Sequence, residues 1–446
     1  MCTQRPDICF IKAFFSDLLR HGIKYCIMRN AHEVADGDAH DVDMCIQDSC
    51  LEKAEQILQQ QSEQLGWKLH LKTGSPKDKS NIKCYNYYYI EPNTKKIYIV
   101  HIDIFPTYAW KGYELISNKI LLTDIQADTI YHAIAPETEA VCNLFVQLLY
   151  NGKIKEKYKP AVLEIFQRHK QRCIELMQNF LKPDTADYVY NCVISEKWDD
   201  INNARKNIVR DTRKKSRRSI VTYFSYLLSK ALNRKGLIVA FQGTDGSGKT
   251  TIINGLPEIL GNTFSNNTLN YYHWRPGILK PEKKSDKDGK PIVNTQPHLL
   301  PPYGKVLSCI KMLFYTADYI LGYWLKVYWQ AAQGHLVVFD RYYYDFYMDK
   351  RRYRLNTSDK LIRFLHHFIP EPDMTFVLLG DAAKIHARKN ELSLVEVEKQ
   401  INTLRQYKDR FKKPVVIDVC QSIKDVLFEV SKNILELLNS KAKNNS

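Results

Sequence analysis

A glycine-rich motif within residues 236–253 constrains the fold of this chain more than any other feature. Residues 237–241 are a short apolar run, which is typical of a buried parallel strand. The turn after this run fits G-x-x-x-x-G-K-[ST] in every fixed position, and helix-compatible residues follow it. The fixed positions are Gly243, Gly248, Lys249 and Thr250. The alternative is a chance glycine turn, for which the flanking strand and helix would be coincidences.

Such a loop predicts a nucleotide site. Backbone N–H groups can curl around phosphate oxygens, and the following helix points its positive end at them. Lys249 is expected to reach the β- and γ-phosphates and Thr250 to ligate Mg²⁺. We therefore predict ATP and Mg²⁺ as cofactors. The expected ATP-binding residues are Gly243, Gly246, Ser247, Gly248, Lys249, Thr250 and Thr251.

The bulk composition limits the class of protein and its partners. A chain of 446 residues suggests two or three domains, and a net charge of +16 favours anionic partners such as nucleotides, nucleic acid or a membrane surface. The 11 cysteines form no C-x-x-C pair, which argues against zinc ribbons and a disulfide scaffold and favours a reducing cytosol. Neither a signal-peptide pattern nor a run of about 18 apolar residues is present. We expect a cytoplasmic protein.

The order of the segments predicts an α/β architecture. After residue 236, strands alternate with helices, which implies a doubly wound, five-stranded parallel sheet that binds ligands at the carboxyl ends of its strands. An α+β domain is expected before it. The expected segments are an α+β domain at 1–150, a helical appendage at 151–204, a basic connector at 205–235, a phosphate-loop domain at 236–440 and a flexible tail at 441–446.

Charged residues follow several of the predicted strands. Asp340 comes after the apolar residues 335–339, where a phosphate-loop protein needs an acid near Mg²⁺. Arg275 and Arg341 also follow strands, and their guanidinium forks suit an acceptor phosphate. Arg388 could neutralise charge that develops on the transferred phosphoryl group. Each arginine alone could be a solvated surface charge, but several arginines at one sheet edge favour a catalytic site. We expect Lys249, Asp340 and Arg388 to be its catalytic residues.

Residues from about 236 to 440 resemble thymidylate kinase. The likeness lies in the phosphate loop, Arg275-Pro276-Gly277, the helix that ends at Tyr319, Asp340-Arg341-Tyr342, and Arg388-Lys389 followed by Glu391. The resemblance implies that Asp245 contacts the acceptor sugar, Tyr315 faces the base, and Arg388 is the lid arginine.

This stretch also departs from the thymidylate kinase pattern. Gln242 replaces a glutamate, Tyr319 replaces an arginine that holds the acceptor phosphate, and residues 276–305 form a foreign insertion. The acceptor therefore stays open between dTMP, another nucleotide and a phosphorylated sugar.

Three carboxylates stand out in the first 150 residues. Asp41 and Asp43 are two apart, so a strand places both on one face, and Asp103 lies inside another strand. Together they could hold Mg²⁺ and a nucleoside triphosphate, or they could be the polar residues of half-exposed strands. These strands resemble the minimal nucleotidyltransferase superfamily, which implies a metal-binding role for the three residues. Arg29-Asn30 replaces the family's Gly-Ser, which leaves open a degenerate, substrate-sensing or structural domain.

The basic connector at 205–235 contains an amphipathic stretch. Its apolar residues recur with helical spacing from Ile220 to Ala231. Such a helix could contact an anionic membrane weakly, or it could pack on a neighbouring domain with its charges in solvent, which we favour. We expect a homodimer and no nucleic-acid partner.

Our leading interpretation is an ATP- and Mg²⁺-dependent phosphotransferase of the thymidylate kinase type, which converts dTMP or a related nucleotide to the diphosphate. One alternative is a nucleotidyltransferase that acts through the N-terminal domain, with the phosphate-loop half as a nucleotide sensor. Others are a kinase of a phosphorylated sugar and a nucleotide-gated module that binds nucleic acid through the connector.

Overall fold

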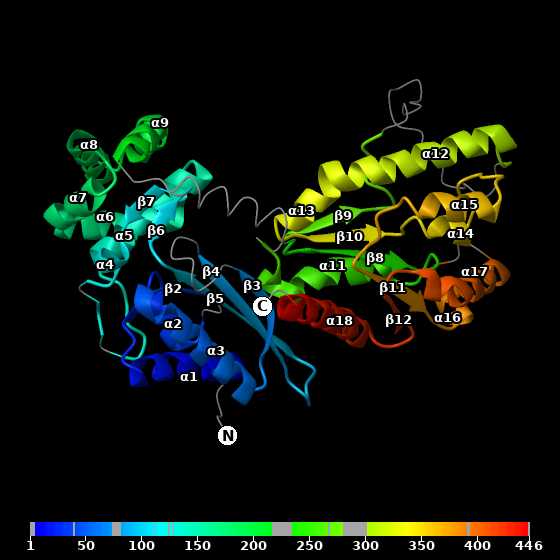
Figure 1. Ribbon diagram of the computed structural model, residues 1–446, viewed down its shortest axis with the longest axis horizontal. Helices are drawn as coiled ribbons and strands as arrows, with labels where there is room; N and C mark the ends of the chain where they lie inside the picture. The colour runs from blue at the N-terminus through cyan, green and yellow to red at the C-terminus, as the bar shows by residue number, and fades with distance from the viewer. Residues whose placement is uncertain are drawn as a thin grey trace. The chain divides into compact units, whose positions relative to one another are not determined.

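The computed structural model describes residues 5–38, 41–73, 82–111, 113–123, 125–127, 129–215, 234–265, 268–279, 301–389 and 393–444. The chain divides into two compact units, one of residues 1–228 with 439–446 and one of residues 229–438 (Figure 1). Within the described residues, no helix combines the length and the apolar character needed to cross a membrane. Residues 220–231 of the predicted amphipathic stretch and Glu391 lie outside the described residues, as does most of the insertion.

The first unit contains a mixed five-stranded sheet in the order β1-β2-β5-β4-β3. β2 and β5 are parallel, and the other neighbouring strands are antiparallel. One face of the sheet packs on helices α1 and α3 because alternate strand residues, such as Val100, Ile102 and Ile104, are buried and apolar. The elements are α1 (Pro6–Arg20), β1 (Tyr25–Ile27), α2 (Ala31–Asp36), β2 (Asp41–Ile46), α3 (Leu51–Gln64), β3 (Lys68–Thr73), β4 (Lys83–Ile90) and β5 (Ile97–Phe105).

A second core in this unit lies among helices. Phe145 and Phe180 meet edge to face at 4.8 Å, and Phe166 stacks on Tyr190. The predicted connector, which was expected to start at residue 205, begins inside the last of these helices, α9. This part of α9 belongs to the core, since Ile208 and Thr212 are fully buried and Asp211 is nearly so. The elements are a hairpin of β6 (Tyr108–Trp110) and β7 (Tyr113–Ile116), α4 (Asn118–Leu121), α5 (Pro136–Val146), α6 (Lys159–Arg168), α7 (Lys170–Gln178), α8 (Pro183–Ile194) and α9 (Trp198–Lys215).

The second unit is built on a five-stranded parallel sheet in the order β12-β11-β8-β10-β9, which confirms the predicted sheet. Its first strand, β8, lies in the middle of the sheet, so the chain turns to one side for β9 and β10 and to the other for β11 and β12. A strand in this position creates a crevice at its carboxyl end. The strands are β8 (Leu237–Gln242), β9 (Leu269–Tyr272), β10 (Leu336–Asp340), β11 (Met374–Leu379) and β12 (Pro414–Asp418).

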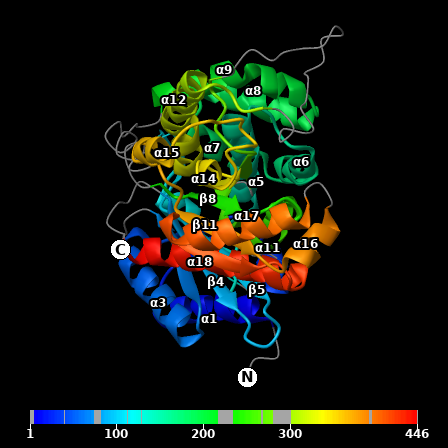
Figure 2. The ribbon, with the colours of Figure 1, turned by 90° about the vertical axis from the view of Figure 1, so that its right-hand side faces the viewer.

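Helices cover both faces of this sheet. Figure 1 shows α12 and α13 along one face and α11 and α18 along the other, and Figures 1 and 2 both show α15 beside α12. The hydroxyl of Ser393 accepts the N–H of Glu396 and so caps the helix that begins at Leu394. The helices are α11 (Lys249–Leu260), α12 (Lys305–Gly322), a π-helical turn (Tyr323–Val327), α13 (Tyr328–Ala332), α14 (Asp345–Met348), α15 (Asp359–His366), α16 (Ala382–Arg388), α17 (Leu394–Tyr407) and α18 (Ile423–Asn444).

Two local features differ from simple expectation. Between β1 and β2 the chain forms helix α2, which is too short and too polar for its period to stand out in the sequence. The predicted flexible tail at 441–446 begins too early, because α18 continues to Asn444. Its apolar period persists, because Leu438 and Ala442 are buried.

Cys9 is disulfide-bonded. The other described cysteines are free thiols, namely Cys26, Cys45, Cys50, Cys84, Cys142, Cys173, Cys192, Cys309 and Cys420.

Candidate active site

The phosphate loop joins the end of β8 to the start of α11. Gly246 and Gly248 have φ angles of +84° and +83°, which glycine adopts without a steric penalty. A Cβ on Gly243 would lie 2.6 Å from Ser247 Oγ, so the close approach of the loop to itself also requires glycine there. The predicted loop therefore has the local conformation that its sequence demands.

Lys249 is the buried cation of the loop. Its Nζ donates to the carbonyl oxygens of Gly243 and Thr244 at 2.9 and 2.8 Å. Burial and, to a lesser extent, the nearby Arg341 guanidinium lower the pKa of Lys249 to about 8, against the opposing effect of Asp340. The ammonium group is thus held inside the curl of the loop, where phosphate oxygens would be its natural partners.

Two hydroxyl groups of the loop fit a phosphate as well. The Oγ atoms of Thr244 and Ser247 are buried and have no hydrogen-bond partner among the described residues. Buried hydroxyls normally pair, so these two can donate to a ligand. Thr250, on the first turn of α11, is exposed, and its side chain can reach a cation in solvent.

Asp340 ends β10 beside the loop. Its Oδ2 accepts the Tyr271 hydroxyl at 3.1 Å, and His273 Nδ1 lies 3.8 Å away, too far for a strong hydrogen bond. Burial alone would raise the pKa of Asp340, but His273 and Lys249 outweigh it and hold that pKa below its usual value. Oδ1 is buried without a partner among the described residues. An ionised oxygen donor of this kind fits Mg²⁺, which usually takes one or two protein ligands and several waters.

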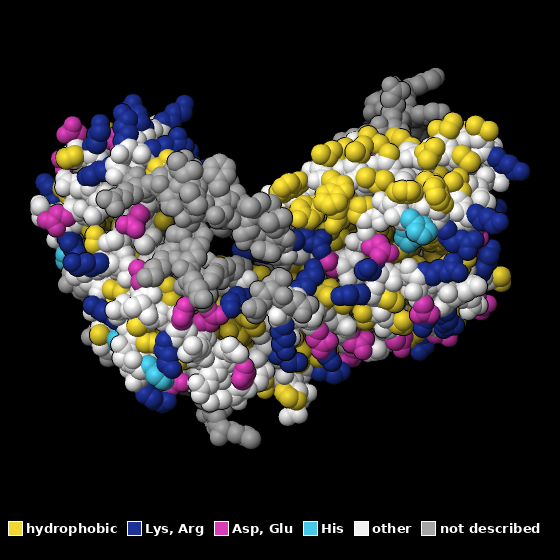
Figure 3. Space-filling model, in the orientation of Figure 1, with side chains coloured by type: hydrophobic (Ala, Val, Ile, Leu, Met, Phe, Trp, Pro, Cys, Tyr) yellow, Lys and Arg dark blue, Asp and Glu magenta, His cyan; other side chains and the backbone are white. Residues whose placement is uncertain are grey.

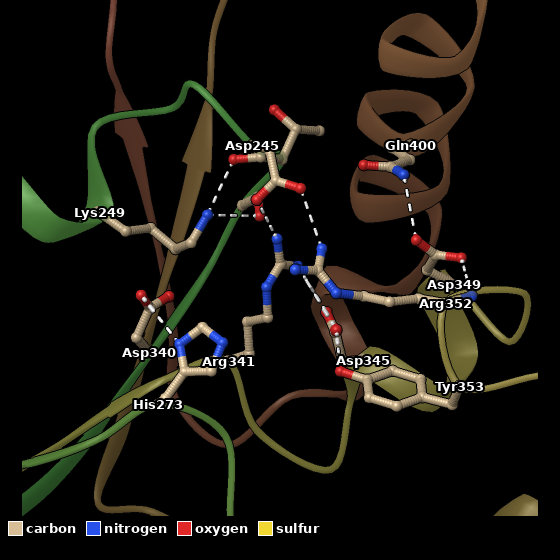
Figure 4. Close-up of polar contacts among 12 residues, drawn as sticks. Asp245, Lys249, His273, Asp340, Arg341, Asp345, Asp349, Arg352, Tyr353 and Gln400 are labelled. Carbon is tan, nitrogen blue, oxygen red and sulfur yellow. Dashed lines mark hydrogen bonds and ion pairs between the residues drawn. The ribbon is translucent and has the colours of Figure 1, made fainter. Parts of the chain in front are cut away.

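Asp245 joins two arginines that are far apart in the sequence. Its Oδ1 accepts Arg341 Nη2 at 2.6 Å and its Oδ2 accepts Arg352 Nη1 at 2.9 Å (Figure 4). Burial would raise the pKa of Asp245, but the two guanidinium groups and Lys249 hold it well below its usual range. The carboxylate expected to contact an acceptor sugar is therefore paired on both oxygens.

Arg341 is the centre of this ion-pair network. Only 5% of the residue is exposed, and Nη1 donates to Asp345 at 3.1 Å while Nη2 reaches Asp245. Burial alone would lower its pKa, but Asp345 and Asp245 raise it. Its φ of +76° is unusual for a residue other than glycine, and such local strain clusters at functional sites.

Arg275 is held by a different carboxylate. Its Nη1 lies 2.7 Å from Asp318 Oδ2, and Asp318 also accepts the backbone N–H groups of Gly277 and Leu279. Tyr319 follows Asp318 and donates its hydroxyl to the Trp274 carbonyl at 2.6 Å, so it has a structural role. Arg275 lies at the same edge of the sheet as Arg341, but it pairs with a different carboxylate.

The structure does not bring Arg388 to this network. It is the last residue of α16, its side chain is exposed, and Nη2 donates to the Val419 carbonyl at 2.9 Å. The proposed lid role therefore requires the side chain to leave Val419.

Gln242 stands where thymidylate kinases have a glutamate. Its amide is fully buried and has no hydrogen-bond partner among the described residues. It lines a cavity of about 10 Å³ together with Thr244 and Asp349, which is room for about one water molecule. The cavity is too small for a nucleotide, so phosphates must bind on the open side of the loop.

The three N-terminal carboxylates are only partly gathered. Asp43 on β2 lies opposite Asp103 on β5, and Asp41 lies opposite His101. Arg29 Nε donates to Asp43 Oδ2 at 2.5 Å. Burial raises the pKa of Asp43, although Arg29 opposes the shift. Among the described residues, no group of three or more His, Cys, Asp or Glu side chains could hold a metal ion. Arg29 contacts one oxygen of Asp43 and would compete with a cation for it.

Several site residues were missing from the sequence prediction. Arg352 is not among the strand-end residues predicted above, and it reaches Asp245 across 107 residues of sequence. Asp345, four residues after Arg341, carried a weak local signal of helical spacing. Tyr271 and His273 carried none. Two tyrosines shortly after Arg341 have structural roles, because Tyr343 and Tyr344 are fully buried and bond to the backbone of Ile362 and Lys412.

The second unit is similar in sequence to thymidylate kinases. The family model for thymidylate kinase matches residues 241–430. A "Probable thymidylate kinase" of Archaeoglobus fulgidus is 26% identical over 217 residues, which are 47% of this chain and 100% of that protein. The crystal structure of thymidylate kinase from Ehrlichia chaffeensis matches at 20% identity over 45% of this chain and 98% of that chain, with a TM-score of 0.29. The predicted likeness of the C-terminal half is confirmed, whereas that of the N-terminal domain to nucleotidyltransferases stays a prediction.

Proposed function

Because residues 241–430 form a thymidylate kinase-like domain, we propose that this protein is an ATP- and Mg²⁺-dependent phosphotransferase that acts on the phosphate of an acceptor. The main support is the cluster at the carboxyl ends of β8, β9 and β10. It combines the phosphate loop, a buried Lys249, an ionised Asp340 and the arginines Arg275 and Arg341 at one edge of the sheet. Arg352 joins this cluster through Asp245.

Each residue has a defined part in the proposed reaction. Lys249 and the hydroxyls of Thr244 and Ser247 bind phosphate oxygens of ATP. Asp340 and Thr250 would hold Mg²⁺, which when bound offsets negative charge on those oxygens. Arg275 and Arg341 orient the acceptor phosphate. Their carboxylate partners fix both guanidinium groups in advance, so little reorganisation is needed at the moment of transfer.

Release of ADP in the presence of candidate acceptors tests this proposal. We expect ADP formation to require ATP, Mg²⁺ and a phosphorylated acceptor, and removal of Mg²⁺ with EDTA to stop it. dTMP, other nucleoside monophosphates and sugar phosphates are the acceptors to compare. Failure of the protein to bind ATP in the presence of Mg²⁺ would contradict the proposal.

The nucleotidyltransferase alternative has weaker support. Arg29 pairs with Oδ2 of Asp43 and so competes with a metal ion for that carboxylate oxygen. A substrate-sensing or structural role of the first domain is compatible with this pairing.

We also propose that the protein is a homodimer through the apolar face of α12 and α13 (Figure 3). These helices, with the π-helical turn between them, expose Val306, Leu307, Ile310, Leu313, Leu321, Trp324, Leu325 and Trp329 at 45–76%. Their exposed area is on the order of 800 Å², close to what each partner buries in a stable dimer and above the largest apolar patches of most monomers. A second copy of the same face would cover it with two-fold symmetry.

A charge placed on this face is expected to produce monomers. Leu325→Glu would bury a carboxylate at the interface, and sedimentation equilibrium should report the monomer mass. Val395→Glu, at a 73% exposed position on α17, is the matched control and should leave the dimer intact. A monomeric wild-type protein, or a dimeric Leu325→Glu variant, would contradict this interface.

A further inference from the structure

Four aromatic rings pack together beside the arginines of the site. Trp274 stacks on Tyr353 with ring centroids 4.4 Å apart, and Tyr315 stacks on Phe346 at 5.6 Å. The two pairs are joined edge to face, since Trp274 lies 4.9 Å from Tyr315 and 5.5 Å from Phe346. We call these four residues the aromatic cluster.

The aromatic cluster is continuous with the ion-pair network. Trp274 precedes Arg275, Phe346 follows Asp345, and Tyr353 follows Arg352 in the sequence. The Tyr353 hydroxyl also donates to Asp345 Oδ2 at 2.6 Å. The rings therefore occupy the acceptor side of the site, next to the groups proposed to hold the acceptor phosphate.

This packing conflicts with stacking of a nucleobase on Tyr315. A base needs a free ring face, but Phe346 already lies parallel to Tyr315 at an interplanar angle of 24°. Trp274 meets Tyr315 at an interplanar angle of 70°, and the guanidinium of Arg275 lies over the Tyr315 ring, 5.7 Å from its centre. Trp274 is no freer as a platform, because Tyr353 stacks on it and Tyr315 and Phe346 also pack against it edge to face.

The polar groups of the site favour an anion with hydrogen-bond acceptors. Both oxygens of Asp245 accept from arginines, so a ribose hydroxyl would have to compete with two charged hydrogen bonds. Arg352 uses Nη1 for Asp245, and a guanidinium has five N–H donors, so it can also bind a phosphate. The indole Nε1 of Trp274 is buried without a partner among the described residues and can donate to a ligand oxygen.

We infer that the phosphoryl acceptor is a phosphate monoester without a nucleobase, namely a sugar phosphate. This inference rests on the proposed phosphotransferase function and names its substrate class. An oxygen of the acceptor phosphate dianion forms a bond to the γ-phosphorus of ATP. The bond from that phosphorus to the β,γ-bridging oxygen breaks, and its electron pair leaves with ADP. The product is a sugar diphosphate ester, and no proton needs to be removed from the attacking oxygen.

A matched pair of acceptors tests the inference, since 2-deoxyribose 5-phosphate and dTMP differ at C1, where the first carries a hydroxyl and the second the thymine. The full-length protein is assayed for ADP release with ATP and Mg²⁺, and ³¹P NMR identifies the diphosphate product. We expect kcat/KM for dTMP to be at least about tenfold lower than for 2-deoxyribose 5-phosphate, a ratio that pocket shape alone can produce. Equal or better use of dTMP would overturn the inference.

Variants of Trp274 test the role of the aromatic cluster. Trp274→Ala opens the space beside Tyr315 and should shift the ratio of kcat/KM values toward dTMP by about tenfold. Trp274→Phe keeps an aromatic ring and should retain the wild-type preference. An unchanged ratio in Trp274→Ala, with ATP affinity equal to wild type as proof of folding, counts against the inference.

Calorimetry separates failure of this inference from failure of the proposed function. Absence of ATP binding would refute the phosphotransferase itself. Titration of the protein with each compound then still decides the acceptor class. Tighter binding of 2-deoxyribose 5-phosphate than of dTMP supports the inference, whereas tighter or equal binding of dTMP, or binding of neither, overturns it.

Discussion

Replacement of Lys249 by alanine is expected to lower kcat by about 100-fold or more, the loss seen when one preorganised donor to a developing negative charge is removed. Lys249 is the buried cation whose Nζ already lies 2.9 Å from the Gly243 carbonyl, inside the loop that would hold the phosphates. No other described side chain in the loop carries a positive charge. ADP release with the best acceptor measures the effect, and circular dichroism checks that the fold is retained. Turnover close to the wild-type rate would remove Lys249 from the mechanism.

The charge of Lys249, rather than its shape, should decide ATP binding. Because burial lowers its pKa to about 8, the free protein loses this positive charge as the pH rises through that value. ATP affinity measured by calorimetry should therefore fall over roughly one pH unit on either side of 8. Lys249→Arg stays charged throughout this range and should remove the pH dependence. The same slope in both proteins would assign the titration to another group.

Replacement of Arg341 by alanine is expected to lower the free energy of unfolding by about 3 kcal/mol, because it leaves buried carboxylates without their partner. The Arg341 side chain is 6% exposed, and its partners Asp245 and Asp345 are 19% and 2% exposed. Both the native and the variant residue carry a Cβ, so the strain of a φ of +76° is present in each and cancels. Chemical denaturation of the two proteins measures the difference.

Two controls separate this ion-pair effect from a general loss of charge. Arg351→Ala removes an exposed arginine ten residues away and should change stability by less than about 0.5 kcal/mol. In the wild-type protein the pKa of Asp245 is held well below its usual range, so this carboxylate stabilises the fold above its unfolded pKa of about 4. That contribution is lost as the pH falls through the folded pKa. The difference between wild type and Arg341→Ala should therefore shrink below pH ~4. A constant difference would mean that the loss comes from packing.

The sequence was most informative where its signals are local. The phosphate loop needs an apolar strand, glycines at fixed spacing and a helix, and all of these lie within residues 236–253. Most strands of the parallel sheet could be predicted because they are short apolar runs between polar turns. The residue after each strand could then be placed at one edge, since parallel strands end on the same side. Lys249, Asp340 and Arg341 were found in this way, and β8 pairs with β10 so that Phe241 lies opposite Asp340.

What the sequence by itself determined was therefore the fold of the C-terminal half and the position of its phosphate site. The partner of each charged side chain was decided only by the tertiary structure. Asp245 joins Arg352 across 107 residues, Arg275 joins Asp318 across 43 positions of the chain, and Arg388 bonds to Val419 rather than to the site. An exposed loop arginine and a buried, paired one look alike in a sequence, because a charged side chain carries no periodic signal. Which carboxylate it meets depends on how distant segments pack, and that is also why the stacking of Trp274 on Tyr353 could not be predicted.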